Sequence, residues 1–430
     1  LGDVYKRQGV DVEAAFEPEY VMIDGKGPVL KKLRAAAKKA ESILLATDPD
    51  REGEAIAFHI AEMLGASKDG TGGRFRRIAF NEITQSAVLE AIEDPVTLDL
   101  DRVEAQQARR ILDRLVGYKL SPLLWKKIKG GLSAGRVQSV AVSLLVQRER
   151  ERREFRSAVF WDLRANLNVD GHEFKANLKK VDGVDVASGR DFDESTGALK
   201  TGRDVVLLSE SDANKLRVAL ADETFSVHAL DQKQSTRRPY PPFTTATLQQ
   251  EANRKLNLGA RETMGVAQGL YEDGLITYMR TDSTNLSAEA VDSCRELIGG
   301  DYGPRYLPEE AKSYSSKEGA QEAHEAIRPA GDRFRHPDAV ASEVPKSEAR
   351  VYEMVWQRTV ASQMTDALGD TVQVRISGRP SDGPPAILGT SGTVITHQGF
   401  RRAYVEETDE DSGDETGDSV LPEMAAGDQV

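Results

Sequence analysis

The 430-residue sequence has one cysteine, six histidines and no apolar run close to the roughly 20 residues that a membrane span requires. The single Cys294 excludes an internal disulfide framework and any cysteine-based zinc site within the sequence. The histidines are scattered, with no two at metal-ligand spacing, so a bound metal would be held by carboxylates, which favours Mg²⁺ or a similarly hard ion. Nothing near the start resembles a secretion signal, and we expect a cytosolic protein.

The sequence also lacks a P-loop, the glycine-rich motif that cradles nucleotide phosphates. Its formal net charge of −13 argues at first against a nucleic-acid partner. The charge is unevenly distributed, however: residues 101–156 contain 14 Lys or Arg against six Asp or Glu, whereas residues 406–418 contain eight acids and no base. A positive stripe on an acidic protein can still bind a phosphate backbone, and the acidic run is typical of a disordered loop.

The hydrophobic fraction of 39% and the charged fraction of 30% are typical of a soluble protein with enough material for two to four domains. The run at 42–47, Ser-Ile-Leu-Leu-Ala-Thr, predicts a strand of a parallel sheet that is buried on both faces. Three acids follow it at every second position: Asp48, Asp50 and Glu52. Carboxylates this close repel one another unless a cation lies among them, although helix capping by Asp50 is an alternative explanation for part of the pattern.

The basic region begins with a predicted helix at 101–115, with Val103, Ala108, Ile111, Leu112 and Leu115 directed inward. A turn is expected at Ser121-Pro122, and the glycine-rich segment 130–138 opens a second helix whose apolar side chains also face inward. Free backbone N–H groups before a helix can approach a phosphate, but the same segment also fits an ordinary flexible link.

Residues 161–178 alternate in polarity and turn at Asp170-Gly171, which predicts a β-hairpin. Further strands are expected at 224–231, 372–376 and 393–396, on both sides of a helical block at 244–367. Within the block the pattern predicts helices at 245–256, 261–271, 288–297 and 347–364. This order indicates a sheet domain interrupted by an inserted helical domain, with a hinge near 235–242.

The helical block contains Tyr278 and Arg280, which follow a short β-prone run after Gly274. Two residues apart on extended backbone, they would share one face. A phenol oxygen can attack phosphorus and a guanidinium can hold the phosphate, but these two residues alone favour the simpler interpretation of a cross-strand pair at a surface. His324 is usually read as a loop residue, yet beside phosphate chemistry it could donate a proton.

Six segments together resemble the bacterial type IA DNA topoisomerase family. They occur in the family's order and span about residues 12–405, which makes the resemblance specific. The segments are Asp-Pro-Asp-Arg-Glu-Gly-Glu at 48–54, Ala-Arg-Arg-Ile-Leu-Asp-Arg-Leu-Val-Gly-Tyr at 108–118, Leu-Ser-Ala-Gly-Arg-Val-Gln-Ser at 132–139, Arg-Pro-Tyr-Pro-Pro-Phe at 238–243, Gly-Leu-Ile-Thr-Tyr-Met-Arg-Thr-Asp-Ser at 274–283 and His-Glu-Ala-Ile-Arg-Pro at 324–329.

The resemblance implies a multidomain α/β plus α+β fold whose domains enclose a toroidal hole. The implied parts are a TOPRIM domain with a Rossmann-like parallel sheet (1–97, incomplete at its N-terminus), the first part of a helical DNA-binding domain (98–157), the first part of a β-rich hinged arch (158–236), an inserted helical domain with the catalytic tyrosine (237–366) and the return of the arch with its acidic loop (367–430).

The resemblance also implies roles for particular residues. Tyr278 would form a 5′-phosphotyrosine link, with Arg280, His324 and Glu52 as further catalytic residues. Asp48, Asp50 and Glu52 would hold Mg²⁺, with no need for ATP or zinc. The residues implied in binding single-stranded DNA are Arg109, Arg110, Asp113, Tyr118, Trp125, Ser133, Ala134, Gly135, Arg136, Val137, Gln138 and Arg280.

The implied activity is ATP-independent relaxation of negatively supercoiled DNA by a cytoplasmic, nucleoid-associated monomer. The family's first TOPRIM strand, with its glutamate and lysine, has no counterpart in residues 1–11, and the family's later segments are expected beyond residue 430. We therefore expect the 430-residue chain to relax DNA poorly or not at all. The alternatives are a topoisomerase III-like decatenase, a TOPRIM nuclease or primase-like enzyme, and a non-catalytic single-strand-binding module.

Overall fold

The computed structural model describes residues 9–21, 24–66, 73–169, 171–221, 223–314, 325–380, 383–404, 421–422 and 424–430. The chain divides into two compact units. Unit 1 comprises 1–146, 241–294 and 313–359, and unit 2 comprises 147–240, 295–312 and 360–430. Across the described ranges, no helix is both long enough and apolar enough to cross a membrane.

The N-terminal part of unit 1 is built on two parallel strands, β3 (Ile43–Leu45) and β4 (Phe75–Arg77), which confirms the predicted parallel pairing. Leu45 and Phe75 pack with Ala57 and Ala61 of helix α3 (Arg51–Met63) in a small apolar core. The expected burial of the strand on both faces is wrong, because the side chain of Leu44 is 41% exposed. The other elements here are β1 (Val10–Asp11), β2 (Glu17–Pro18), α2 (Gly27–Ala37) and α4 (Gln85–Glu93).

Two long helices follow, α5 (Leu100–Lys127) and α6 (Arg136–Glu154). The turn expected at Ser121-Pro122 is wrong, since α5 continues through Pro122 at the loss of one main-chain hydrogen bond. The expected inward packing is also wrong for most positions: of the apolar residues predicted inward on α5 only Val103 is buried, and α6 has no buried residue. The apolar residues of α6 that were expected to face inward are therefore exposed in the described part of the chain.

The helical block confirms the predicted helices, with α8 (Thr245–Leu256), α9 (Ala260–Glu272), α10 (Ala288–Leu297) and α12 (Lys346–Ser362). The short helix α11 (Pro337–Ala341) adds to them. Thr244 begins α8 by accepting a hydrogen bond from the backbone N–H of Thr247, and Asn257 ends it with the left-handed φ of +54°. Local capping chemistry therefore sets both ends of this helix.

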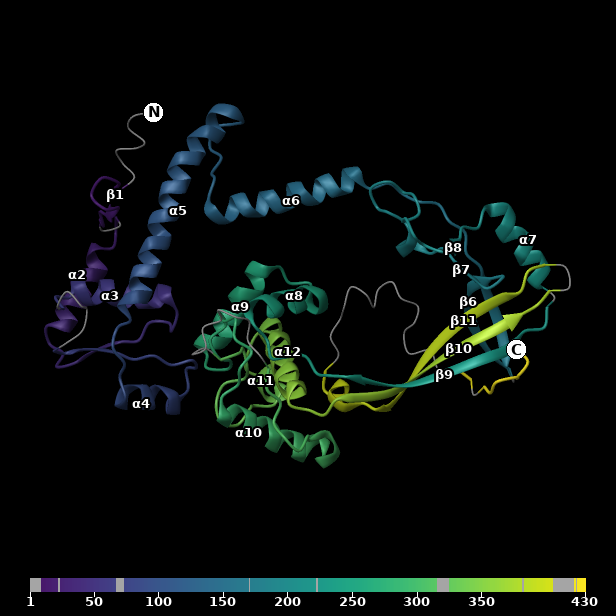
Figure 1. The fold of residues 1–430 in the computed structure, drawn as a ribbon. Helices are drawn as coiled ribbons and strands as arrows, with labels where there is room; N and C mark the ends of the chain where they lie inside the picture. The colour runs from purple at the N-terminus through teal and green to yellow at the C-terminus, as the bar shows by residue number, and fades with distance from the viewer. Residues whose placement is uncertain are drawn as a thin grey trace. The chain divides into compact units, whose positions relative to one another are not determined.

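Unit 2 contains a seven-stranded sheet in the order β8-β7-β6-β11-β10-β9, with β5 paired to β6. Figure 1 shows β9, β10 and β11 as long strands running side by side. Inward-facing residues such as Phe174, Ile376 and Leu388 form its core with helix α7 (Glu210–Ala221). The strands are β5 (Arg164–Val169), β6 (His172–Val181), β7 (Val184–Val186), β8 (Val205–Val206), β9 (Ser226–Arg237), β10 (Ala367–Gly378) and β11 (Ala386–His397), and the short helices are η1 (Gly189–Asp191), η2 (Ile298–Tyr302), η3 (Pro304–Tyr306) and η4 (Gly399–Arg402).

The sheet confirms two sequence predictions. Strands β5 and β6 form the predicted hairpin, in which Val169 pairs with His172 and Gly171 has the positive φ that a two-residue turn requires. Strands β9 and β10 pair antiparallel along their length, and Arg237 is the register partner of Ala367. The helical block therefore leaves and re-enters the sheet at one point, as an insertion between neighbouring strands does.

Candidate active site

The acid segment sits where β3 passes into α3. Asp50 is the N-cap of α3, because its Oδ1 accepts a hydrogen bond of 2.7 Å from the backbone N–H of Gly53. A Cβ at Gly53 would lie 2.1 Å from the carbonyl oxygen of Asp48, so only glycine lets the helix start so close to this loop. The capping interpretation is thus correct for Oδ1 of Asp50, whereas Oδ2 takes no part in capping.

Arg77 supports this loop from beneath, and sequence reasoning missed it. Its guanidinium is almost fully buried, pairs with Glu54 at 2.9 Å, and donates to the carbonyl oxygens of Leu45, Thr47 and Asp48 at 2.8–3.0 Å. Such a paired, fully hydrogen-bonded guanidinium fixes the backbone that carries the acids. Arg77 is one of three arginines at 74–77, and nothing in the sequence distinguishes it as the buried one.

Tyr278 lies in an irregular segment after α9, not in the β-strand that the sequence predicts. Ile276 makes a single bridge to Pro329, and the backbone N–H of Tyr278 donates to the carbonyl oxygen of Asn81 at 2.7 Å. Gly274 ends α9 with φ of +69°, and a Cβ there would lie 2.4 Å from the carbonyl oxygen of Ile83. The segment is therefore held by close backbone contacts with residues 81–83.

The hydroxyl of Tyr278 donates a hydrogen bond of 2.6 Å to Oδ2 of Asp50. Arg280 approaches the same carboxylate, with its Nη1 3.8 Å from Oδ2, and its side chain is 57% exposed. Burial, and then the hydrogen bond and charge of Asp50, raise the pKa of the Tyr278 phenol well above its ordinary range. Tyr278 is therefore a protonated phenol beside an acceptor for its proton and a solvent-exposed cation.

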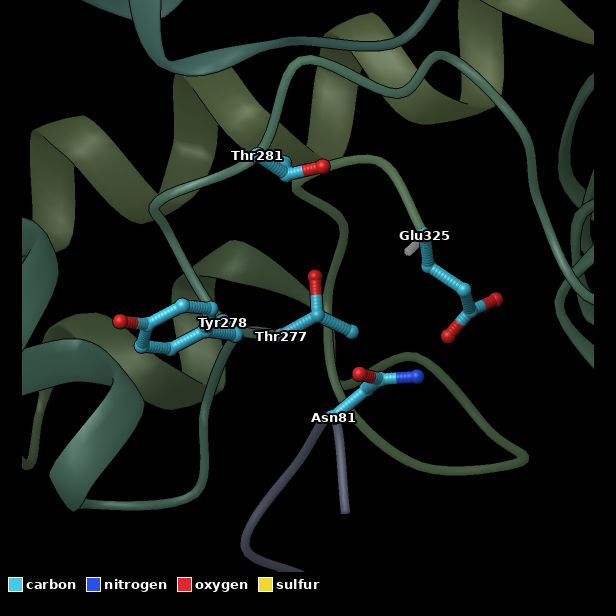
Figure 2. Close-up of a pocket in the computed structure, with 5 residues that line it drawn as sticks. All are labelled: Asn81, Thr277, Tyr278, Thr281 and Glu325. Carbon is cyan, nitrogen blue, oxygen red and sulfur yellow. The ribbon is translucent and has the colours of Figure 1, made fainter. Parts of the chain in front are cut away.

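The pocket beside this tyrosine is narrow. It is lined by Asn81, Thr277, Tyr278, Thr281 and Glu325, and leaves no room for a water molecule. Figure 2 shows Tyr278, Glu325 and Asn81 on three different stretches of the chain, with the Tyr278 ring and the Glu325 carboxylate directed away from each other. Tyr271 packs edge-on against the Tyr278 ring at a centroid distance of 5.3 Å. The phenol is thus fixed in its orientation toward Asp50.

The predicted magnesium ligands are only partly brought together. Burial, followed by the charge of Asp50, raises the pKa of Asp48, so these two carboxylates lie close enough to destabilise each other. Glu52 has a half-exposed side chain that lies 3.7 Å from Arg51. Among the described residues, no three acidic, histidine or cysteine side chains form a ready-made metal cluster. The donor chemistry fits Mg²⁺, and the trio as its ligand set stays a prediction.

Apart from Arg280, the predicted DNA-binding residues lie on α5, on α6 and in the loop between them. Arg136 forms a two-point ion pair with Asp113 at 2.8 and 3.2 Å, which lowers the pKa of the Asp113 carboxyl. The indole N–H of Trp125 donates to the carbonyl oxygen of Leu132 at 2.6 Å, so the ring has a fixed orientation. The guanidinium of Arg114 lies over the ring of Tyr118, 5.2 Å from the ring centre, in a cation–π contact.

The remaining members of this set are exposed or half-buried positions around the same loop. They are Arg109 and Arg110 on α5, Ser133, Ala134 and Gly135 in the loop before α6, and Val137 and Gln138 in its first turn. The backbone N–H of Ala134 donates to the hydroxyl of Ser121, and is therefore not free for a phosphate. His324 lies outside the described residues. The structure thus brings together Tyr278, Arg280, Asp50 and Asp48, and separately the α5–α6 set.

The fold and this site define a multidomain α/β protein in which an acid-bearing parallel sheet meets a tyrosine from an inserted helical block. Family models match almost the whole chain, a Toprim domain over residues 7–83 and DNA topoisomerase over residues 97–430. The chain belongs to the DNA topoisomerase family. The sequence-based prediction of the type IA family is therefore confirmed.

Individual relatives agree with this family. The chain is 47% identical over 436 residues to DNA topoisomerase 1 of Mycolicibacterium smegmatis, covering 99% of this chain and 46% of the relative. It is 47% identical over 430 residues to DNA topoisomerase 1 of Synechococcus elongatus, covering 100% and 47%. The chain spans about half the length of these curated relatives.

A solved structure gives the same result for the fold. Full-length topoisomerase I from Thermotoga maritima matches with a TM-score of 0.74 at 33% identity, over 99% of this chain and 64% of that one. The predicted multidomain α/β class is confirmed.

Proposed function

We propose that this protein is the catalytic portion of a type IA DNA topoisomerase, which relaxes negatively supercoiled DNA by cutting and rejoining one strand without ATP. The observation that carries the proposal is the 2.6 Å hydrogen bond from Tyr278 to Asp50, with Arg280 beside the same carboxylate. The family match and the bacterial relatives support the same activity. The proposed site of action is the nucleoid, in the cytoplasm. The proposed active form is a monomer.

In the proposed reaction, the phenolic oxygen of Tyr278 attacks the phosphorus of a phosphodiester in one strand. Its proton passes to Asp50, the bond from phosphorus to the 3′ oxygen breaks, and the leaving oxygen takes up a proton to become a 3′-hydroxyl. The strand is then held through a 5′-phosphotyrosine. One phosphodiester replaces another, so the step is close to balanced in free energy and reverses without a nucleotide.

Tyr278 and the charged groups around it prepare this step. The raised pKa of Tyr278 keeps the phenol neutral until the phosphate arrives, because a free phenolate would be unfavourable beside Asp50. Arg280 is exposed and can pair with the non-bridging oxygens as their charge develops. Asp48, Asp50 and Glu52 would hold Mg²⁺, which when bound supplies positive charge near the phosphate. His324 is proposed as a further phosphate contact.

The α5–α6 set is proposed to hold the single strand that leads to Tyr278. Trp125 is 44% exposed and oriented by its hydrogen bond to Leu132, so its face is available for a base. Arg109, Arg110 and Arg136 supply positive charge beside it. Stacking combined with phosphate contacts binds unpaired DNA with little dependence on sequence.

A labelled oligonucleotide tests the proposal directly. Single-stranded DNA labelled at its 3′ end is incubated with the protein, denatured and resolved on a gel. A 5′-phosphotyrosine link retains the 3′ label on the protein, whereas a 5′ label leaves with the released fragment. Tyr278→Phe should abolish the labelled adduct, and Tyr352→Phe, which alters a buried tyrosine on α12, should keep it. An adduct from Tyr278→Phe, or one that carries the 5′ label, would refute the proposal.

A further inference from the structure

Arg328 is a buried arginine that pairs with two carboxylates, Glu82 and Glu325. Its side chain is 6% exposed. Nη1 donates to Glu82 at 2.9 Å, and Nη2 and Nε donate to Glu325 at 2.7 and 3.3 Å. Glu325 lies three residues before Arg328, whereas Glu82 lies 246 residues away in sequence. The ion pair with Glu82 therefore joins two distant parts of unit 1.

The backbone of Arg328 is directly coupled to the residue before Tyr278. The N–H of Thr277 donates to the carbonyl oxygen of Arg328 at 2.9 Å, and the N–H of Arg328 donates to the hydroxyl of Thr277 at 2.9 Å. The same hydroxyl donates to the carbonyl oxygen of Ala326 at 2.8 Å. A shift of Arg328 must therefore move Thr277, and with it the tyrosine.

Glu82 is coupled to the other side of the same tyrosine. It follows Asn81, whose carbonyl oxygen accepts the N–H of Tyr278. Its Oε2 receives the backbone N–H of Gly331 at 3.0 Å as well as the guanidinium of Arg328. The Glu82 carboxylate thus joins its own segment, which bonds Tyr278 through Asn81, to the segment at 328–331, which bonds Thr277.

We propose that the Glu82–Arg328 ion pair is a positioning device that keeps the Tyr278 hydroxyl against Asp50 while the strand is cut. The inference rests on the proposed function. A buried charge pair tolerates little displacement, because separating it leaves charges without partners in a region of low dielectric. When Glu82 is changed, Glu325 can still pair with Arg328, so the buried guanidinium keeps one carboxylate partner. The register between the two segments is the property that Glu82 controls.

Two substitutions separate positioning from packing. Glu82→Gln keeps the shape and removes the charge, whereas Glu82→Asp keeps the charge and shortens the side chain by one methylene. We expect Glu82→Gln to lower the single-turnover rate of adduct formation by about 10- to 100-fold, since small displacements of a nucleophile cost this much. Glu82→Asp should recover part of that rate. Affinity for the oligonucleotide should be unchanged in both variants.

Thermal midpoints provide the contrasting readout. The shape-conserving Gln variant should be at least as stable as the Asp variant, so the order of stability should oppose the order of rate. A wild-type rate for Glu82→Gln, or rates that follow the thermal midpoints, would overturn the inference. Tyr278→Phe is measured alongside: an adduct from that variant refutes the proposed function, whereas its loss together with an unaffected Glu82→Gln refutes only the positioning role.

Discussion

Replacing Gly274 by alanine tests whether the contact between the Tyr278 segment and residues 81–83 sets the rate of strand cutting. Gly274 has φ of +69°, and a side chain in this left-handed region costs about 1–2 kcal/mol. The new Cβ would also lie 2.4 Å from the carbonyl oxygen of Ile83, about 1 Å closer than the roughly 3.5 Å of ordinary contact. The two segments must therefore separate by a distance on the order of 1 Å.

A displacement of this size at a nucleophile costs on the order of 100-fold in rate. We expect Gly274→Ala to lower the rate of covalent adduct formation, measured in a single turnover with saturating labelled oligonucleotide, by about this factor. The free energy of unfolding should fall by only about 1–3 kcal/mol, which leaves the protein folded at assay temperature.

The matched control is Gly25→Ala. Gly25 has φ of +83° but nothing within 4 Å of an added Cβ, so the variant carries the same backbone strain without a collision. It should cut DNA at the wild-type rate. A wild-type rate for Gly274→Ala, or an equal loss in both variants, would refute the reasoning.

Three further predictions concern other parts of the molecule. Trp125→Ala should weaken binding of a single-stranded oligonucleotide by about 1–3 kcal/mol in a fluorescence titration, whereas Trp161→Ala, which removes a similarly exposed indole of unit 2, should not. Millimolar Mg²⁺ should raise the thermal midpoint of the wild type by binding the folded state, and Asp48→Asn should remove most of that gain. Burial and the nearby Arg305 lower the pKa of His397 below its ordinary 6.5. Because the unfolded chain then binds a proton more readily than the folded protein, the free energy of unfolding should fall as the pH drops below about 6.5. His397→Gln should reduce this loss in pH-dependent thermal unfolding.

The parts of the fold that depend on local chemistry were predictable from the sequence. Helix α8 has its predicted ends because Thr244 and Asn257 cap it, and the β5–β6 hairpin follows from its glycine turn. The long α5 was not predictable in the same way. A proline usually ends a helix or marks a turn, but Pro122 lies inside a helix of 28 residues that continues despite one missing main-chain hydrogen bond.

The candidate site divides along the same line. The acids and the tyrosine were visible in the sequence because they lie in recognisable segments. The hydrogen bond between Tyr278 and Asp50 could not be predicted from the sequence, since it joins residues 228 positions apart and depends on how α9 ends at Gly274. Arg77 and Arg328 were missed for a related reason: the role of a buried arginine shows only when its carboxylate partners from other segments are known.

Peptide mass spectrometry tests the central claim most directly. The covalent adduct is trapped by denaturation, the DNA is trimmed with nuclease and the protein is cleaved with trypsin. The peptide at 262–280 contains two tyrosines, Tyr271 and Tyr278, which fragmentation distinguishes. The account predicts a nucleotide linked through its 5′ phosphate to Tyr278. A nucleotide on Tyr271, or on a residue outside this peptide, would contradict it.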